Sequence, residues 1–203
     1  MRESFSEHLQ YMLRIALIRP GSTDYDAEGR IQGTLDIPLN EQGGKEVAQL
    51  IEEIRSEGIE IIYAAPCEPA WQTAQALAEA LAIKAKKIDS LQNLDQGLWQ
   101  GMLIEDVHRK QPKVYRQWQE QPETVCPPEG EMLSQAEDRI RTALAKLLKR
   151  HHDGVLGLVI PEPLATLVRG HLKHEDVGDL WKAAREHRRW EVLELVPENA
   201  MIT

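Results

Sequence analysis

The chain has few of the features that would reveal its class at once. It contains two cysteines among 203 residues, Cys67 and Cys126, too far apart in sequence to indicate a disulfide framework or a metal-ligand cluster. No apolar run reaches the roughly 18 residues of a membrane span. The first eight positions contain no apolar segment of the kind found in a signal peptide. We therefore expect a cytoplasmic protein with ordinary thiols.

Positive charge is also scarce. The chain has 24 Lys and Arg against 33 Asp and Glu, for a formal net charge of -9. Non-specific nucleic-acid binding depends on Lys and Arg neutralising phosphates, so we expect no nucleic-acid partner and no membrane partner. Hydrophobic residues make up 42% of the chain and charged residues 28%, which is typical of a soluble globular domain with one sizeable core.

Short apolar runs alternate with segments of helical periodicity. We expect strands at residues 13–19, 61–65, 86–88, 155–160 and 192–196. We expect helices at residues 40–56, 69–81, 104–110, 114–119, 133–151 and 164–172, the first with Asn40 as its N-cap. This alternation predicts an α/β fold with a mostly parallel sheet and helices on both faces. Residues 1–12 are expected to be a polar lead-in, residues 21–39 a long polar loop, and residues 13–203 one domain.

The stretch Leu17–Thr23 follows the first expected strand and ends in turn residues. Loops at the carboxyl ends of parallel strands are where α/β folds bind their ligands. Arg19 would lie at the tip of that strand, where its guanidinium could bind an anion. The next residue, where a nucleophile would be useful, is Pro20.

An ordered series of sequence blocks resembles the histidine phosphatase superfamily, in its phosphoglycerate mutase-like branch. The resemblance covers roughly residues 13 to 196, with the blocks in the family's order and spacing. The blocks are Arg19-Pro-Gly-Ser-Thr, Gly29-Arg-Ile-Gln-Gly33, Asp36-Ile-Pro-Leu-Asn-Glu-Gln-Gly43, Ile62-Tyr-Ala-Ala-Pro66, Gln72-Thr-Ala74, Gly97-Leu-Trp-Gln-Gly101 and Pro127-Pro-Glu-Gly-Glu131. The resemblance implies a three-layer α/β/α domain with its pocket at the carboxyl ends of the strands.

The resemblance also implies a chemistry, namely phosphoryl transfer through a phosphohistidine. Such a reaction needs an unprotonated ring nitrogen as nucleophile, cationic groups around the phosphoryl oxygens and an acid for the leaving group. At the four corresponding positions this sequence has Pro20, Pro69, Asn93 and Pro161. No catalytic residue is therefore expected at the family's positions.

Part of the family's anion-binding set remains. It comprises Arg19, Ser22, Thr23 and Arg30. Three further residues are expected to face the pocket: Asp26, Trp71 and Glu162. Arg19 is either a remnant phosphate ligand or, as we expect, the partner of a carboxylate such as Asp26 or Glu162. Trp71 is expected to fill the space that phosphate occupies in the family. The basic run at residues 185–189 is expected to be a solvated turn.

Three functions are compatible with these residues. The first is a catalytically inactive module, a pseudoenzyme that binds or regulates an unknown protein partner or small ligand. The second is a phosphatase with relocated catalytic groups, using Asp26 or a carboxylate near Glu162. The third is a structural subunit that self-associates as a homo-oligomer or partners an active relative. The sequence favours the first. We expect no cofactor and no metal, because His171 and His174, at i, i+3 spacing, are more often solvated than metal-bound.

Overall fold

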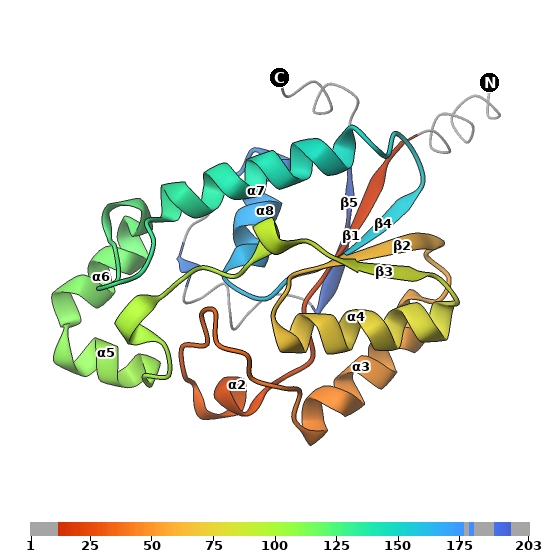
Figure 1. Cartoon of the computed structure of the whole chain (residues 1–203). Coiled ribbons are helices and arrows are strands. Elements are labelled where there is room, and N and C mark those ends of the chain that lie inside the picture. Colours follow the sequence, from red (N-terminus) through yellow and green to blue (C-terminus); the bar gives the residue numbers. More distant parts are fainter. Residues whose placement is uncertain (1–11, 177–178, 181–188, 196–203) are drawn as a thin grey trace.

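A five-stranded sheet forms the centre of the fold (Figure 1). The structure, a computed structural model, describes residues 12–176, 179–180 and 189–195. The predicted lead-in therefore lies, apart from Met12, outside the described residues. The strands are β1 (Arg14–Ile18), β2 (Ile59–Ala64), β3 (Lys84–Lys87), β4 (Val155–Val159) and β5 (Trp190–Glu194), in the spatial order β3-β2-β4-β1-β5.

Four of these strands run parallel and one does not. β4 pairs in parallel with both β1 and β2, so that Val159 lies opposite Ile18 on one side and Ala64 on the other. β3 extends the parallel set beside β2, and β5 pairs antiparallel with β1. The predicted mostly parallel sheet is thus confirmed, with an antiparallel strand at one edge, as is common in larger α/β sheets.

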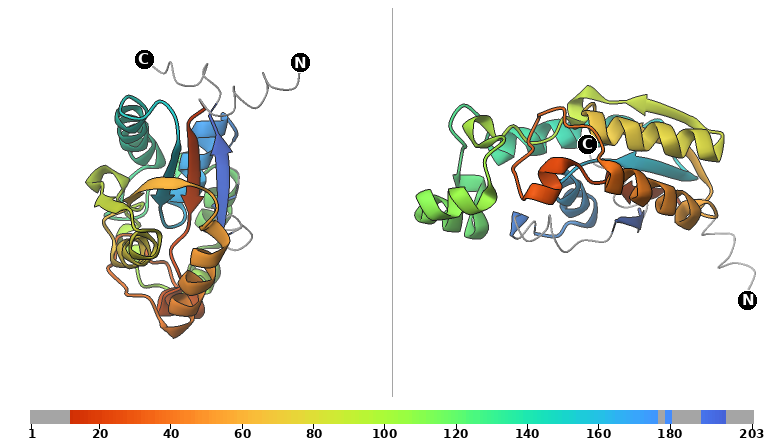
Figure 2. Two further views of the ribbon diagram at one scale, coloured as in Figure 1. Left: turned by 90° about the vertical axis from the view of Figure 1, so that its right-hand side faces the viewer. Right: turned by 90° about the horizontal axis from the view of Figure 1, so that it is seen from below.

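Helices cover both faces of the sheet (Figure 2). The helices of the described residues are α2 (Asp24–Glu28), α3 (Glu41–Ile54), α4 (Glu68–Leu81), α5 (Ile104–Lys110), α6 (Pro112–Glu120), α7 (Leu133–Leu148) and α8 (Leu164–Lys173), of which α5 and α6 lie away from the sheet (Figure 1). Short 3-10 turns occur at η1 (Asp89–Leu91), η2 (Gly97–Trp99) and η3 (Pro122–Thr124). No helix in the described part of the chain is long and apolar enough to cross a membrane.

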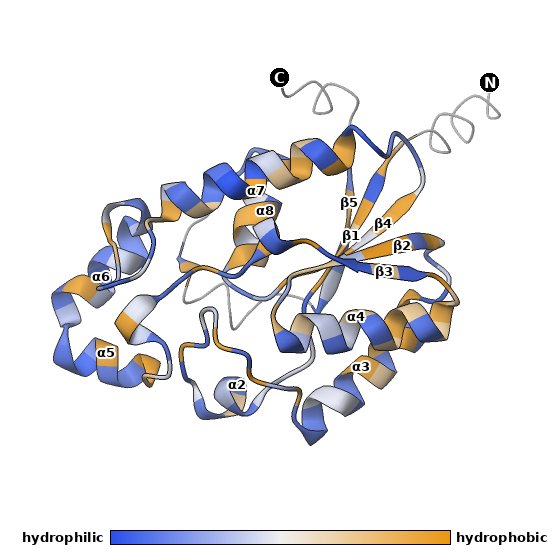
Figure 3. Cartoon of the chain, viewed as in Figure 1, coloured by the Kyte–Doolittle hydropathy of each residue, from blue (hydrophilic) through white to orange (hydrophobic). Residues whose placement is uncertain are grey.

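Two apolar clusters, one on each face of the sheet, account for the three layers. On one face, Leu50 of α3 and Leu77 of α4 pack with sheet residues such as Ile62. On the other face, α7 and α8 contribute side chains such as Leu144 and Val168. Figure 3 shows the strands β1, β2 and β4 as largely hydrophobic, whereas the helices alternate between hydrophobic and hydrophilic residues. The α/β/α architecture is therefore confirmed, because α3 and α4 bury apolar side chains against one face of the sheet, and α7 and α8 against the other.

The region predicted as one long loop, residues 21–39, contains the short helix α2. Thr23 caps it: Thr23 Oγ1 accepts a hydrogen bond from Asp26 N at 3.3 Å, and Asp26 Oδ2 in return accepts one from Thr23 N at 2.7 Å. Gly29, with φ of 68°, ends it in the left-handed conformation. The prediction of an uninterrupted loop was wrong, because local capping forms a helix too short to show apolar periodicity.

The first turn of α3 fixes the loop that follows β1. Asn40 is the N-cap, as predicted, and its Oδ1 accepts a hydrogen bond from Gly43 N at 2.8 Å. A Cβ on Gly43 would lie 2.1 Å from the backbone oxygen of Ser22, so only glycine allows this approach. The backbone of residues 21–22 is therefore packed directly against α3.

Candidate functional site

Two loops leave the sheet side by side at its carboxyl end. Ile18 and Val159 are register partners at the ends of β1 and β4, and Ile160 N donates to Ile18 O at 2.9 Å. The chain after β1 therefore starts beside the chain after β4. Arg19 heads the first loop, and Glu162 lies in the second. A parallel sheet places ligand-binding groups in this way, because its loops converge at one edge.

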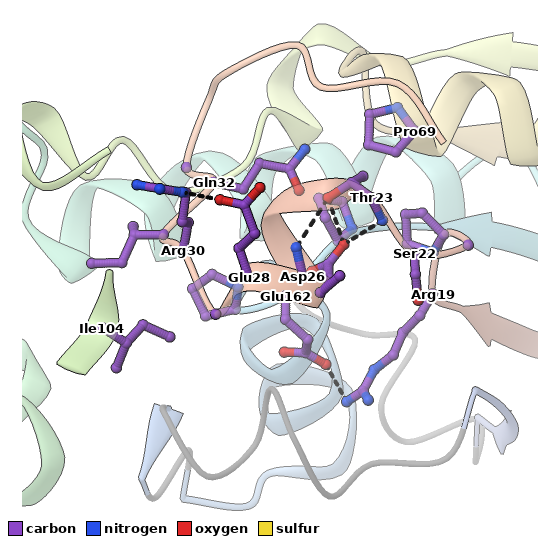
Figure 4. A pocket seen from close by; sticks show the side chains of 18 of the residues that line it. Arg19, Ser22, Thr23, Asp26, Glu28, Arg30, Gln32, Pro69, Ile104 and Glu162 are labelled. Atoms are coloured by element: carbon purple, nitrogen blue, oxygen red, sulfur yellow. Dashed lines mark hydrogen bonds and ion pairs between the residues drawn. The ribbon is translucent and has the colours of Figure 1, made fainter. Parts of the chain in front are cut away.

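A cavity of about 930 Å³ opens between these loops and α2 (Figure 4). Its wall carries three arginines, Arg19, Arg30 and Arg189, and four carboxylates, Asp26, Glu28, Glu46 and Glu162. Pro20, Pro69 and Pro161 also line it, so three of the four positions that the resemblance assigns to catalysis meet at this cavity. Such a volume suits a small organic ligand.

Arg19 and Glu162 form an ion pair inside the cavity, between Arg19 Nη2 and Glu162 Oε1 (Figure 4). Their side chains are only 17% and 11% exposed. Burial lowers the pKa of the Arg19 guanidinium from its ordinary value, while the neighbouring Glu162 carboxylate opposes that shift. Of the two partners expected for Arg19, the structure selects Glu162.

Two further residues of the first loop, Ser22 and Thr23, also donate to carboxylates. Ser22 donates to Glu46 Oε2 from both its backbone nitrogen, at 2.9 Å, and its hydroxyl, at 2.8 Å. Thr23 engages Asp26 in the same way. Burial by itself would raise the pKa of Glu46, but the hydrogen bonds from Ser22 and Gln42 and the charge of Arg189 together outweigh it, and the pKa is lowered. Ser22 and Thr23 therefore direct their donors to negatively charged oxygens, here those of Glu46 in α3 and Asp26 in α2.

Arg30 lies at the opposite side of the cavity from Arg19 (Figure 4). Its Nε donates to Glu28 Oε2 at 2.5 Å and its Nη1 to Gly101 O at 2.8 Å. The structure therefore places Arg30 in the cavity wall but apart from the Arg19–Glu162 pair. The apolar side chains of Ile104, Trp118 and Leu180 also contribute to the wall.

Asn93 is fully buried next to the cavity rather than in its wall. Its Nδ2 donates to Gly33 O and to Glu162 O, each at 3.0 Å. Arg139 of α7 holds the same segment by donating to the backbone oxygens of Gln92 and Asn93. The residue at the family's acid position is thus a connector between loops.

Trp71 lies elsewhere than expected. It is not among the residues that line the cavity; it packs against the apolar cluster of α3 and α4. Lys87 Nζ lies 4.9 Å from the centre of its ring, a cation–π contact with the edge strand. Trp71 is on the helix that begins near the cavity, but its position directs the ring towards β3.

Two residues of the site were missed from the sequence. Glu46 belongs to the exposed polar stripe of α3 by periodicity, and only the close approach of residues 21–22 brings it to Ser22. Arg189 was expected in a solvated turn, yet it lines the cavity and donates from Nη1 to Glu46 O at 3.3 Å. Its own carbonyl accepts from Arg19 N at 3.0 Å. The rest of that basic run lies outside the described residues.

Comparison with known families matches residues 15–202 to the histidine phosphatase superfamily (branch 1). The chain belongs to this superfamily. The resemblance stated from the sequence blocks is therefore confirmed. Among the described residues, no group of three or more His, Cys, Asp or Glu is arranged to hold a metal ion.

Several relatives of this superfamily member are named as enzymes of phosphate esters. Phosphoserine phosphatase 1 of Hydrogenobacter thermophilus is 29% identical over 184 residues, which cover 91% of this chain and 87% of that protein. A probable phosphoglycerate mutase of Salmonella paratyphi B is 31% identical over 138 residues, covering 68% of this chain and 64% of that protein.

Solved structures give the same fold. A putative alpha-ribazole-5'-P phosphatase from Escherichia coli superimposes with a TM-score of 0.77 at 20% identity, covering 90% of each chain. A mycobacterial glucosyl-3-phosphoglycerate phosphatase superimposes with a TM-score of 0.74 at 23% identity, covering 90% of this chain and 97% of that chain. At these identities the likeness concerns the fold alone.

These relatives correct one interpretation of the sequence. The prolines at positions 20, 69 and 161 led us to expect a pseudoenzyme that acts as a binding or regulatory module. That expectation is contradicted, because the phosphoserine phosphatase matches across nearly the whole chain. The alternative, a phosphatase with relocated catalytic groups, agrees better with them.

Proposed function

We propose that this chain hydrolyses phosphate monoesters in the cavity at the carboxyl ends of β1 and β4. The observation that carries the proposal is the largely buried Arg19, held at the tip of β1 beside the Glu162 carboxylate. A guanidinium presents five N–H donors in a fork that matches phosphate oxygens. Arg19 can therefore bind two phosphate oxygens while one N–H still holds Glu162.

The proposed reaction is a direct displacement by water. Neither Pro20 nor Pro161 offers a ring nitrogen that could form a phosphoryl-enzyme intermediate. Glu162 takes a proton from a water molecule as that water's oxygen attacks phosphorus, and the bond between phosphorus and the ester oxygen breaks. The departing alkoxide takes a proton from solvent and Glu162 returns its proton to solvent, so the products are an alcohol and inorganic phosphate. Arg19 stabilises the negative charge on the phosphoryl oxygens.

The alcohol part of the substrate would contact the wall beyond Glu162, which includes Ile104, Trp118 and Leu180. Those side chains are apolar, so an aryl phosphate is a suitable first probe. The relatives support the class of reaction, since phosphoserine phosphatase 1 acts, by its name, on a phosphate monoester.

The test is release of p-nitrophenol and inorganic phosphate from p-nitrophenyl phosphate by the purified chain and its variants. Arg19→Ala is expected to lower kcat/KM by roughly 10²–10³-fold, the usual effect of losing one preorganised charge stabiliser. Glu162→Gln is expected to lower kcat by roughly 10²–10⁴-fold, the usual contribution of a general base. Arg55→Ala, at an exposed pair on α3, serves as the control and should leave turnover unchanged.

Two results would overturn the proposal. The first is an absence of phosphate release by the folded wild-type protein above the uncatalysed rate. The second is turnover that survives both Arg19→Ala and Glu162→Gln unchanged, because such activity would come from other groups or from a contaminating phosphatase. Measuring the unfolding transition of each variant separates lost activity from lost fold.

A further inference from the structure

We propose that Thr166 is a positioning residue that holds the Glu162 carboxylate in the orientation needed for proton transfer. This inference rests on the hydrolysis proposed above. Thr166 Oγ1 donates to Glu162 Oε2 at 2.7 Å, and Thr166 N donates to the same oxygen at 3.3 Å. The other carboxylate oxygen, Oε1, faces Arg19. The two oxygens are thus held by different partners, one on each side.

The anchor itself is rigid. Thr166 lies in the first turn of α8 and is only 7% exposed, and its neighbours Ala165 and Leu167 are buried in the core. The backbone of Glu162 is fixed separately, because its carbonyl oxygen accepts from Asn93 Nδ2 at 3.0 Å. A free glutamate side chain samples many rotamers, and fixing both its backbone and one oxygen removes most of that freedom. Such preorganisation is what a general base requires.

The direction of the hydroxyl is informative. A threonine inside a helix usually donates to the backbone carbonyl four residues earlier. For Thr166 that carbonyl belongs to Glu162, which already accepts from Asn93. The hydroxyl instead reaches the carboxylate of the same residue. A purely structural alternative is that Glu162 only caps the first turn of α8, in which case the hydroxyl would affect stability and not turnover.

The two roles are separated by replacing the hydroxyl and measuring kcat and KM independently. Thr166→Val removes the hydroxyl and keeps the branched shape, whereas Thr166→Ser keeps the hydroxyl. Thr166→Val is expected to lower kcat by roughly 10–10²-fold, in the range that follows misplacement of a catalytic group by about 1 Å. KM for p-nitrophenyl phosphate and the Kd of inorganic phosphate should stay within about twofold, because Arg19 still binds the phosphate.

Thr166→Ser should restore kcat to near the wild-type value. Thr142→Val is the matched control, since Thr142 is an exposed helical threonine on α7 whose hydroxyl donates to Asp138 O at 2.9 Å. It should leave kcat and KM unchanged. If Thr166→Val does not fold, Thr166→Ala removes the same hydroxyl without changing the expected result.

Each outcome decides the proposal. A wild-type kcat in Thr166→Val or Thr166→Ala, with lower stability, would overturn the positioning role and leave the hydrolysis intact, as capping alone would then explain the contact. A Thr166→Ser variant as slow as Thr166→Val would also overturn it, because the hydroxyl would not be the relevant group. No turnover by the wild-type protein would reject the hydrolysis itself and this role with it.

Discussion

Asn93 donates a hydrogen bond from its side-chain amide to the backbone carbonyl of Glu162 across 69 positions of sequence, at 3.0 Å. The same nitrogen donates to Gly33 O, and Asn93 Oδ1 accepts from Leu94 N at 2.9 Å. One buried amide therefore joins the loop after α2, the segment around η1 and the loop after β4. Two of these segments, the loop after α2 and the loop after β4, contribute to the cavity wall.

Removing this amide is expected to destabilise the protein. In Asn93→Ala two carbonyl oxygens lose their donor, so the free energy of unfolding should fall by about 2–6 kcal/mol, at about 1–3 kcal/mol for each unsatisfied group. Asn93→Asp should cost at least as much at neutral pH, because a carboxylate would face two carbonyl oxygens. Urea denaturation measures both. Gln75→Ala, at an exposed position of α4, is the control. If Asn93→Ala lowered the free energy of unfolding no more than Gln75→Ala does, the role of Asn93 would be contradicted.

Two adjacent glycines in the first turn of α3 should respond in opposite ways to alanine. A Cβ on Gly43 would lie 2.1 Å from Ser22 O, whereas a Cβ on Gly44 would meet nothing within 4 Å. Gly44→Ala should therefore raise the free energy of unfolding by up to about 1 kcal/mol, through helix propensity alone. Gly43→Ala should lower it, by about 1–3 kcal/mol, because the backbone of the loop must shift.

Thermal or urea unfolding of the two variants tests this pair directly, since each is the other's control. A Gly43→Ala protein as stable as Gly44→Ala would show that the loop after β1 can move away from α3 at little cost. In that case the close packing that brings Glu46 to Ser22 would not be a fixed part of the site.

The hydrogen bonds between Ser22 and Glu46 should make stability depend on pH. The pKa of Glu46 is lowered in the folded state relative to its ordinary value. The stabilisation that the Glu46 carboxylate gives the folded state is therefore fully present above the unfolded pKa of about 4.3. It is lost as the pH falls through the folded pKa. Ser22→Ala should lower the free energy of unfolding by about 1 kcal/mol at pH 7, and by less at pH 3.5. Ser56→Ala, at an exposed turn, is the control and should show no such pH dependence. If Ser22→Ala lowered the free energy of unfolding equally at both pH values, the Glu46 carboxylate would not be stabilising.

The two cysteines should differ sharply in reactivity. Burial raises the pKa of the Cys67 thiol to about 11, whereas Cys126 is exposed. Only the thiolate reacts with a disulfide reagent, so at pH 8 Cys67 should be almost inert. Titration with a chromogenic aromatic disulfide should detect one thiol in the folded protein and two in urea. Rapid reaction of both thiols without denaturant would contradict the burial of Cys67.

The fold could be predicted in good part because its signals are local or repeat at regular intervals. Asn40 before an amphipathic run predicted α3, and the short β-branched run before Pro66 predicted β2. The ends of elements were less accurate: α7 ends at Leu148 although the periodicity continued to His151. The antiparallel direction of β5 has no signal in its own residues, since strand direction depends on how the chain returns to the sheet.

The candidate site was only partly predictable, for a physical reason. The presence of Arg19 and Glu162 at two strand ends follows from the sequence pattern, but the choice between Asp26 and Glu162 as partner depends on a competing local contact. Asp26 is engaged by Thr23 three residues away, so Glu162 is the carboxylate that meets Arg19. The position of Trp71 similarly depends on Lys87, a contact between segments that no local pattern encodes.

β3 forms one edge of the sheet and is strongly hydrophilic (Figure 3). Three of its four residues are lysines, Lys84, Lys86 and Lys87. An edge strand exposes unpaired backbone N–H and C=O groups with which a strand of another molecule can pair. Lysine side chains along the edge disfavour that pairing. Two copies of this chain that met edge to edge through β3 would bring six ammonium groups together, so a homo-oligomer built by extending the sheet there is disfavoured. The same lysines also disfavour the repeated edge-to-edge pairing of strands that leads to fibrils.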